Sequence, residues 1–307
     1  MKTAHGFKRL LQTLALAALF ANRCLAAPMS LDAYLAITAP PATTVFHYGP
    51  APSQIVAFYR PRGAGPFPVA ILVHGGCWQS RYGGLPQMGA IAARLAEHGI
   101  AAWNVEYRRV DEPGGGYPGM YQDMGAAIDL LRSRASALDL DASRVLAIGH
   151  SAGAQLALWA ANRSHLPQHS GLHVPVSLPI PTVISLGGFG DLERDANAIR
   201  QACRVDVAAL TGSPDDRRND VFSDTSPAAL PSGTARVIAI NGADDTIAPP
   251  ALAQDYVSRV RKAHGQARLI VVPDGGHLDE VSLTSPVWPI LKKEIHDALQ
   301  FSPPAAR

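Results

Sequence analysis

The sequence lacks the features that mark membrane proteins, disulfide-rich domains and phosphate-binding enzymes. Beyond the N-terminal region, no apolar run reaches the ~18 residues needed to cross a bilayer. Cysteine occurs only three times, charged residues make up 17% of the 307 residues, and no glycine-rich phosphate-binding motif or internal repeat is present. The remaining composition, 47% apolar, is that of a chain able to bury a sizeable core.

Residues 1–26 are predicted to be a secretory signal peptide. Lys8 and Arg9 precede a short apolar run, and Ala26 supplies a small residue for cleavage. Removing this segment takes the formal net charge from +2 to −2, because it carries four basic residues and no acidic one. The basic excess is therefore no argument for a nucleic-acid partner. We expect an exported protein, periplasmic or secreted, with no stable membrane span after signal removal; an amphipathic first helix is the alternative.

The rest of the chain shows short β-rich runs and longer segments with helical spacing. The predicted strands are 43–48, 54–59, 69–73, 100–105, 145–148, 183–186, 236–240 and 269–272, and the predicted helices are 87–98, 121–135, 152–162, 251–263 and 287–299. The first two strands form a hairpin. From residue 69 strand and helix alternate, which predicts an α/β fold with a mostly parallel central sheet and helices on both faces.

Two segments fall outside this alternation. Residues 27–42 are rich in Ala and Pro and predict a loose lead-in. Residues 187–234, after the fourth parallel strand, are polar and rich in Gly, Asp and Pro, and a connection of this length is usually functional. We expect a single domain over 27–307 with a cap-like insertion at 187–234.

A nucleophile motif lies between the strand 145–148 and the helix 152–162. Residues 149–153 read GHSAG, and a sharp turn between a strand and a helix is what a nucleophile elbow requires. This context predicts Ser151 as a catalytic nucleophile, whereas a glycine-rich turn with a helix-capping serine is the alternative. His150 is interpreted as structural, since its position next to the serine does not make it the base.

The loop after the first parallel strand is a candidate oxyanion hole. Residues 73–78 read VHGGCW, and glycines let backbone N–H groups approach a developing negative charge. The expected donors are the N–H groups of Gly76, Cys77 and Ala152. A plain strand-to-helix turn is the alternative.

The acid and the base are sought after the last two strands, in the order of this fold. Asp244 and Asp245 both follow the strand 236–240, and the G-x-x-D-x-x-x-P spacing favours Asp245. His277 follows the last strand and is the predicted general base. The acid would accept the imidazole N–H and stabilise the cation.

Two cysteines remain once Cys24 leaves with the signal. In an exported protein this even pair favours a disulfide between Cys77 and Cys203 over two free buried thiols. Such a bridge would tie the cap-like insertion to the rim of the predicted site.

With these motifs in place, the chain resembles α/β-hydrolase-fold esterases with an HGG oxyanion motif, over most of residues 65–300. The sequence VEYR after the second parallel strand is similar to that group's strand ending in Tyr-Arg. The HGGCW and GHSAGAQLA segments, with the DLE sequence at 191–193, also resemble kynurenine formamidases. Those enzymes hydrolyse an aryl formamide in intracellular tryptophan breakdown, and the predicted export argues against this assignment. Feruloyl-esterase-like domains are a third similar group, and export is consistent with them.

Together these residues predict a serine hydrolase that cleaves a carboxylic ester of a small or aromatic substrate through a Ser-His-Asp triad and an acyl-enzyme. Neither a cofactor nor a metal is expected. His165, His169 and His173 have helical metal-ligand spacing, but Pro167 and Gly171 would break that helix. An arylformamidase or other amide-directed hydrolase acting on an aryl amide is the alternative. A non-catalytic binding module on a hydrolase scaffold is more remote, because no triad residue is missing.

Overall fold

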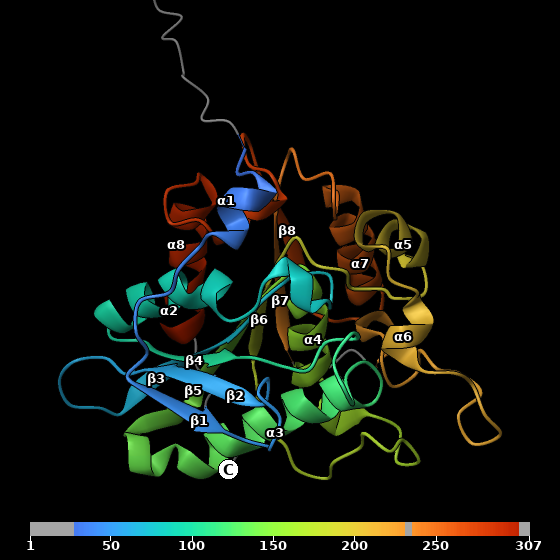
Figure 1. The fold of residues 1–307 in the computed structure, drawn as a ribbon, viewed down its shortest axis with the longest axis horizontal. Coiled ribbons are helices and arrows are strands. Elements are labelled where there is room, and N and C mark those ends of the chain that lie inside the picture. Colours follow the sequence, from blue (N-terminus) through green and yellow to red (C-terminus); the bar gives the residue numbers. More distant parts are fainter. Residues whose placement is uncertain (1–27, 231–234, 301–307) are drawn as a thin grey trace, which may run out of the picture.

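The computed structural model describes residues 28–230 and 235–300. Its centre is an eight-stranded sheet in the order β1-β2-β4-β3-β5-β6-β7-β8 (Figure 1). The strands are β1 (Thr44–His47), β2 (Ile55–Tyr59), β3 (Phe67–Val73), β4 (Ala101–Val105), β5 (Leu140–His150), β6 (Thr182–Leu186), β7 (Arg236–Gly242) and β8 (Ala267–Val272). β2 pairs antiparallel with β1 and β4, and the other pairs are parallel. The predicted signal peptide, 1–26, lies outside the described residues.

Helices cover both faces of this sheet (Figure 1). On one face the core includes α3 (Gly119–Arg134), α4 (Ala152–Ala161) and α7 (Pro250–Lys262), and on the other α2 (Pro86–Glu97) and α8 (Val287–Gln300). Along β3, residues 69, 71 and 73 join the first core and residues 70 and 72 the second, because successive side chains of a strand point to opposite faces. A strand buried on both sides needs apolar residues throughout, which is why its sequence, VAILV, shows no polar alternation.

The N-terminal lead-in is more ordered than the sequence predicts. A short helix, α1 (Leu31–Leu35), begins after Ser30, whose hydroxyl accepts the N–H of Ala33. Tyr34 is 2% exposed and belongs to the core with α2 and α8. A helix cap and one buried aromatic ring thus fix a segment whose Ala- and Pro-rich composition indicated no element.

Residues 187–230 make up most of the described part of the connection between β6 and β7. This connection contains α5 (Ala196–Cys203) and α6 (Val207–Thr211). The carbonyl of Ala209 in α6 accepts the N–H of Tyr117, and an ion pair joins Asp191 to Arg259 of α7. The segment therefore contacts the body of the molecule near its start and near its middle. None of the helices in the described ranges is long and apolar enough to cross a membrane.

Candidate active site

Ser151 occupies a strained turn between β5 and α4. Its backbone has φ 52° and ψ −120°, a combination that costs an ordinary residue free energy and is found at functional sites. A Cβ on Gly149 would overlap the backbone of Gly153 and Ala154, and a Cβ on Gly153 would overlap the carbonyl groups of Val73 and His74. The two glycines of the motif are thus required by close packing, which seats the start of α4 against the end of β3.

The loop after β3 passes directly over this turn. A Cβ on Gly75 would lie 3.0 Å from Cβ of Ser151 and 2.7 Å from Nδ1 of His150, so only glycine permits the approach. Gly76, Cys77 and Trp78 all have positive φ, 108°, 52° and 54°. This run of positive φ values lies at the loop residues from which the sequence predicts two of the oxyanion donors.

Buried side chains that follow β4 contact His74 and stabilise this loop. Nε2 of His74 lies 2.7 Å from Oε1 of Glu106, and Tyr107 stacks on the His74 ring at 4.6 Å while donating its hydroxyl to the His74 carbonyl. Burial alone would raise the pKa of Glu106, but His74 and Arg109 outweigh it and hold that pKa below its usual range. Glu106 is therefore an ionised carboxylate that fixes the imidazole of the HGG motif. Its role was not predicted; the VEYR resemblance was the available signal.

Asp245 and His277 are brought together from two different loops. Nδ1 of His277 lies 2.8 Å from Oδ2 of Asp245, while Oδ1 accepts the N–H groups of Ile247 and Ala248, each at 2.8 Å. Asp245 is 3% exposed, whereas the side chain of Asp244 faces solvent. Of the two candidate acids, Asp245 is the one hydrogen-bonded to the histidine.

His150 connects this pair to the turn that carries Ser151. Its Nε2 donates to the backbone carbonyl of His277 at 3.0 Å, and the two rings lie 4.8 Å apart. Burial, with the neighbouring His277, keeps the pKa of His150 well below its usual range, so the ring is neutral. His277 and Ser151 are not hydrogen-bonded to each other. Hydrogen bonds between catalytic groups are often long in the absence of substrate and tighten when it binds.

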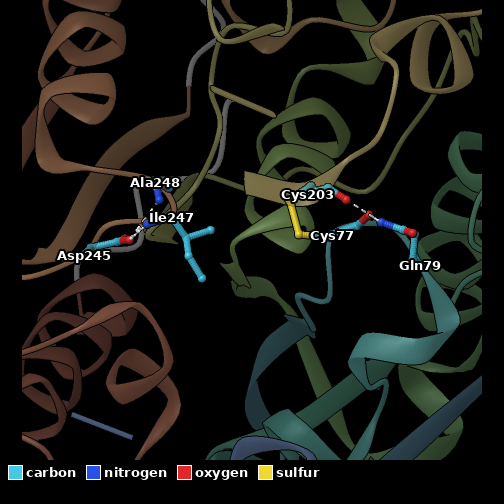
Figure 2. Close-up of a disulfide and its surroundings, with 6 residues drawn as sticks. All are labelled: Cys77, Gln79, Cys203, Asp245, Ile247 and Ala248. Carbon is cyan, nitrogen blue, oxygen red and sulfur yellow. Dashed lines mark hydrogen bonds between the residues drawn. A yellow bond between two sulfur atoms is a disulfide. The ribbon is translucent and has the colours of Figure 1, made fainter. Parts of the chain in front are cut away.

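A disulfide joins Cys77 to Cys203, as the sequence predicts. It links the loop after β3 to the C-terminal end of α5, and Nε2 of Gln79 donates to the Cys203 carbonyl at 2.8 Å beside it. In Figure 2 the disulfide lies across the view from the loop that carries Asp245, Ile247 and Ala248. The connection 187–230 is thus covalently tied to the loop that contains two of the expected oxyanion donors.

The histidines at 165, 169 and 173 lie in a 3₁₀ turn and the loop after it. Nδ1 of His173 donates to the carbonyl of Leu166, and these residues form no potential metal-binding group within the part of the chain that the structure describes. One group of three potential ligands occurs there: His150, His277 and Glu280. Two of its members are already engaged, His277 with Asp245 and His150 with a carbonyl oxygen.

The family model described as BD-FAE matches residues 57–259. Two curated plant proteins also match, each with about one quarter of the aligned residues identical. The Probable isoprenylcysteine alpha-carbonyl methylesterase ICME of Oryza sativa subsp. japonica is 24% identical over 82% of this chain and 61% of its own length. ICMEL2 of Arabidopsis thaliana, of the same description, is 25% identical over 76% and 56%. The chain thus spans about six-tenths of these relatives.

Solved structures with the same fold include two esterases. One is a truncated carbohydrate esterase from gut microbiota, with a TM-score of 0.67, 20% identity, and 85% of this chain and 98% of that chain covered. The other is the propionate-bound esterase Est2 of the Planctomycetes species Thermogutta terrifontis, with a TM-score of 0.67, 18% identity and coverage of 87% and 97%. They establish the α/β-hydrolase fold that the sequence predicts.

Proposed function

The chain belongs to the BD-FAE family of α/β-hydrolase-fold esterases, and from this premise we propose that it is a serine carboxylesterase with Ser151, His277 and Asp245 as its triad. The observation that carries the proposal is the strained Ser151 turn, which lies against the HGG loop and is connected through its neighbour His150 to His277, the residue hydrogen-bonded to Asp245. A nucleophile, an oriented base and a loop of N–H donors are the three parts that acyl transfer needs.

Acylation begins with attack of the Ser151 oxygen on the ester carbonyl carbon while His277 takes the serine proton. The carbonyl oxygen becomes an oxyanion, held by the N–H groups of Gly76, Cys77 and Ala152. Asp245 accepts the N–H of the imidazole and stabilises its positive charge. His277 then protonates the departing alcohol, leaving an acyl-enzyme. A water molecule, deprotonated by His277, attacks the acyl-enzyme; His277 then returns this proton to the departing Ser151 oxygen, which releases the acid and regenerates the free enzyme.

The substrate in this proposal is an ester of a small acid or of an aromatic acid. Family membership and the fold shared with carbohydrate esterases and a propionate-bound esterase support a short acyl group. Hydrolysis of an aryl formamide is the second candidate, because HGGCW and GHSAGAQLA resemble kynurenine formamidases. The discriminating experiment ranks kcat/KM over p-nitrophenyl esters of increasing acyl length, methyl ferulate and N-formylkynurenine. A ranking led by the formamide would replace the ester assignment.

The nucleophile is tested with Ser151→Ala and a serine-reactive fluorophosphonate. The variant should lose about three or more decades of ester hydrolysis, and the wild type should gain one label, on the peptide that contains Ser151. Ser164→Ala, at a half-buried serine of the 3₁₀ turn 163–165, is the matched control and should behave as wild type. Near-wild-type hydrolysis by Ser151→Ala, or labelling elsewhere, contradicts the mechanism.

Export through residues 1–26 completes the proposal. The disulfide supports it, because such bonds form and persist in oxidising compartments. N-terminal sequencing of protein from the periplasm or medium should begin at Ala27. Full-length protein recovered only from the cytoplasm would contradict export.

A further inference from the structure

Glu280 is a buried carboxyl group that the proposed mechanism does not use. It lies on the 3₁₀ turn His277–Val281, three residues after the proposed base, and its side chain is 0% exposed. Oε1 accepts the N–H of Gly242 at 2.8 Å, and Oε2 has no hydrogen-bond partner among the described residues. A fully buried acid with one free oxygen is costly, so its presence at this place needs an explanation.

The contacts of Glu280 join the two loops that carry the acid and the base. Gly242 is the last residue of β7, and its carbonyl accepts the N–H of Asp245 at 3.2 Å. The bond from Gly242 to Glu280 therefore connects the turn of Asp245 to the turn of His277. The two turns are separated by a helix and a strand in sequence, and this bond acts in addition to the Asp245–His277 bond itself.

Oε2 of Glu280 lies close to the hydrogen-bonded pair Asp245 and His277. A Cβ placed on Gly187 would overlap Oε2 of Glu280 and would also lie 2.8 Å from Nδ1 of His277 and 3.0 Å from Oδ2 of Asp245. All three atoms thus surround one point beside the backbone of Gly187. Two carboxyl groups share this small, dry space, and two negative charges there would repel each other strongly.

Among the described residues, no lysine or arginine forms an ion pair with Glu280 that would offset a charge on it. The nearest nitrogen of a basic residue is Nε2 of His150, at 3.9 Å, which already donates to the His277 carbonyl. Asp245 and Asp279, the other titratable groups that act on it, are acids. Burial first, then repulsion from Asp245, raises the pKa of Glu280 well above its usual range.

We propose that Glu280 is a positioning residue that works as a neutral carboxylic acid, holding the Asp245 turn and the His277 turn together without adding a second negative charge. This inference rests on the proposed function, since it assigns Glu280 a task within that site. The neutral acid keeps the acceptor for Gly242 and leaves Asp245 as the one anion that faces the imidazole.

The test compares Glu280→Gln with Glu280→Ala. Gln keeps a carbonyl acceptor for the Gly242 N–H and is neutral at every pH, so kcat/KM should stay within about threefold of wild type. Ala removes the link, and kcat should fall about 10- to 100-fold with a smaller change in KM, because the pair loses its alignment. Glu294→Gln, at a buried glutamate of α8 paired with Arg268, is the matched control and should leave activity unchanged.

The acid limb of the pH profile separates a neutral Glu280 from an ionised one. If Glu280 is neutral, replacing it by Gln leaves the midpoint of the acid limb unchanged. Removing a negative charge would instead let a neighbouring imidazolium lose its proton more easily, which would move the midpoint down by about one pH unit or more. Such a shift, or a loss in Glu280→Gln equal to that in Glu280→Ala, overturns the proposal.

Thermal unfolding gives a readout that does not depend on activity. A carboxyl group whose pKa is raised in the folded state contributes stability that is complete below its unfolded value of 4.5 and is lost as the pH rises through the folded value. The melting temperature of wild type should therefore fall relative to Glu280→Gln as the pH rises from 4.5. If the difference in melting temperature between wild type and Glu280→Gln does not change with pH, Glu280 is not a neutral acid and the proposal is overturned. An active Ser151→Ala would overturn the proposed function but would not change this thermal result.

Discussion

The imidazole of His277 and the carboxylate of Asp245 are held 2.8 Å apart by two turns that meet at the carboxyl edge of the sheet. The other carboxylate oxygen of Asp245 accepts two backbone N–H groups of its own turn. These two hydrogen bonds fix the orientation of the carboxylate independently of His277. Asp244, its neighbour in sequence, faces solvent.

Asp245→Asn should lower kcat by about four orders of magnitude, because an amide cannot hold the imidazole in the required tautomer or stabilise its cation. Asp244→Asn is the matched control and should remain close to wild type. Steady-state kinetics on one activated ester measures both. A larger loss in Asp244→Asn would assign the acid to the exposed residue.

Gly187→Ala should inactivate the enzyme with little loss of fold. Gly187 has φ 49°, and the added Cβ would push into Glu280, His277 and Asp245. Displacement of the pair by even 1 Å is expected to cost about 100-fold in kcat/KM. Gly171→Ala is the control, since a Cβ there meets nothing within 4 Å. Equal kinetics in the two variants would show that the space beside Gly187 has no role in catalysis.

Loss of the Cys77–Cys203 disulfide should lower both stability and activity. The bridge spans 126 residues of sequence, and the chain-entropy model gives about 4–5 kcal/mol for a loop of this size. Denaturant unfolding of the double variant Cys77→Ala/Cys203→Ala checks the first effect. kcat/KM checks the second, because the bridge holds the loop whose Gly76 and Cys77 N–H groups are the proposed oxyanion donors. Reductant should affect the wild type but not the double variant; an unchanged unfolding free energy in the double variant would refute the stabilising role.

Asp195 should make the connection between β6 and β7 sensitive to pH. Burial, with repulsion from Asp191 and Asp255, raises the pKa of Asp195 to about 7. The stability that this group contributes is complete below its usual value of 3.8 and is lost as the pH rises through 7. Asp195→Asn should therefore be more stable than wild type at about pH 8, by roughly 1 kcal/mol or more, and gain less at about pH 5. Urea unfolding at both pH values measures this stability difference, with Asp216→Asn at an exposed residue as the control. A difference between Asp195→Asn and wild type that is the same at both pH values would contradict the prediction.

Much of the fold could be predicted because its signals are local. A strand buried on both faces is a continuous apolar run, and the run VAILV at residues 69–73 predicts β3 by that property. α1 was missed, because its short length leaves no periodic pattern and its stability comes from the burial of Tyr34 against helices far along the chain.

The sequence by itself determined the order of the elements and the turn that bears Ser151, since a GxSxG turn is set by steric constraints within five residues and by the strand and helix that flank it. The tertiary structure decided which carboxylates surround that turn. Asp245, rather than Asp244, meets His277; Glu106 reaches His74; and Glu280 reaches Gly242. These partners lie at least 32 residues apart. Their hydrogen bonds depend on which ends of parallel strands become neighbours, and that is fixed only when the whole sheet has assembled and water has been excluded from its edge.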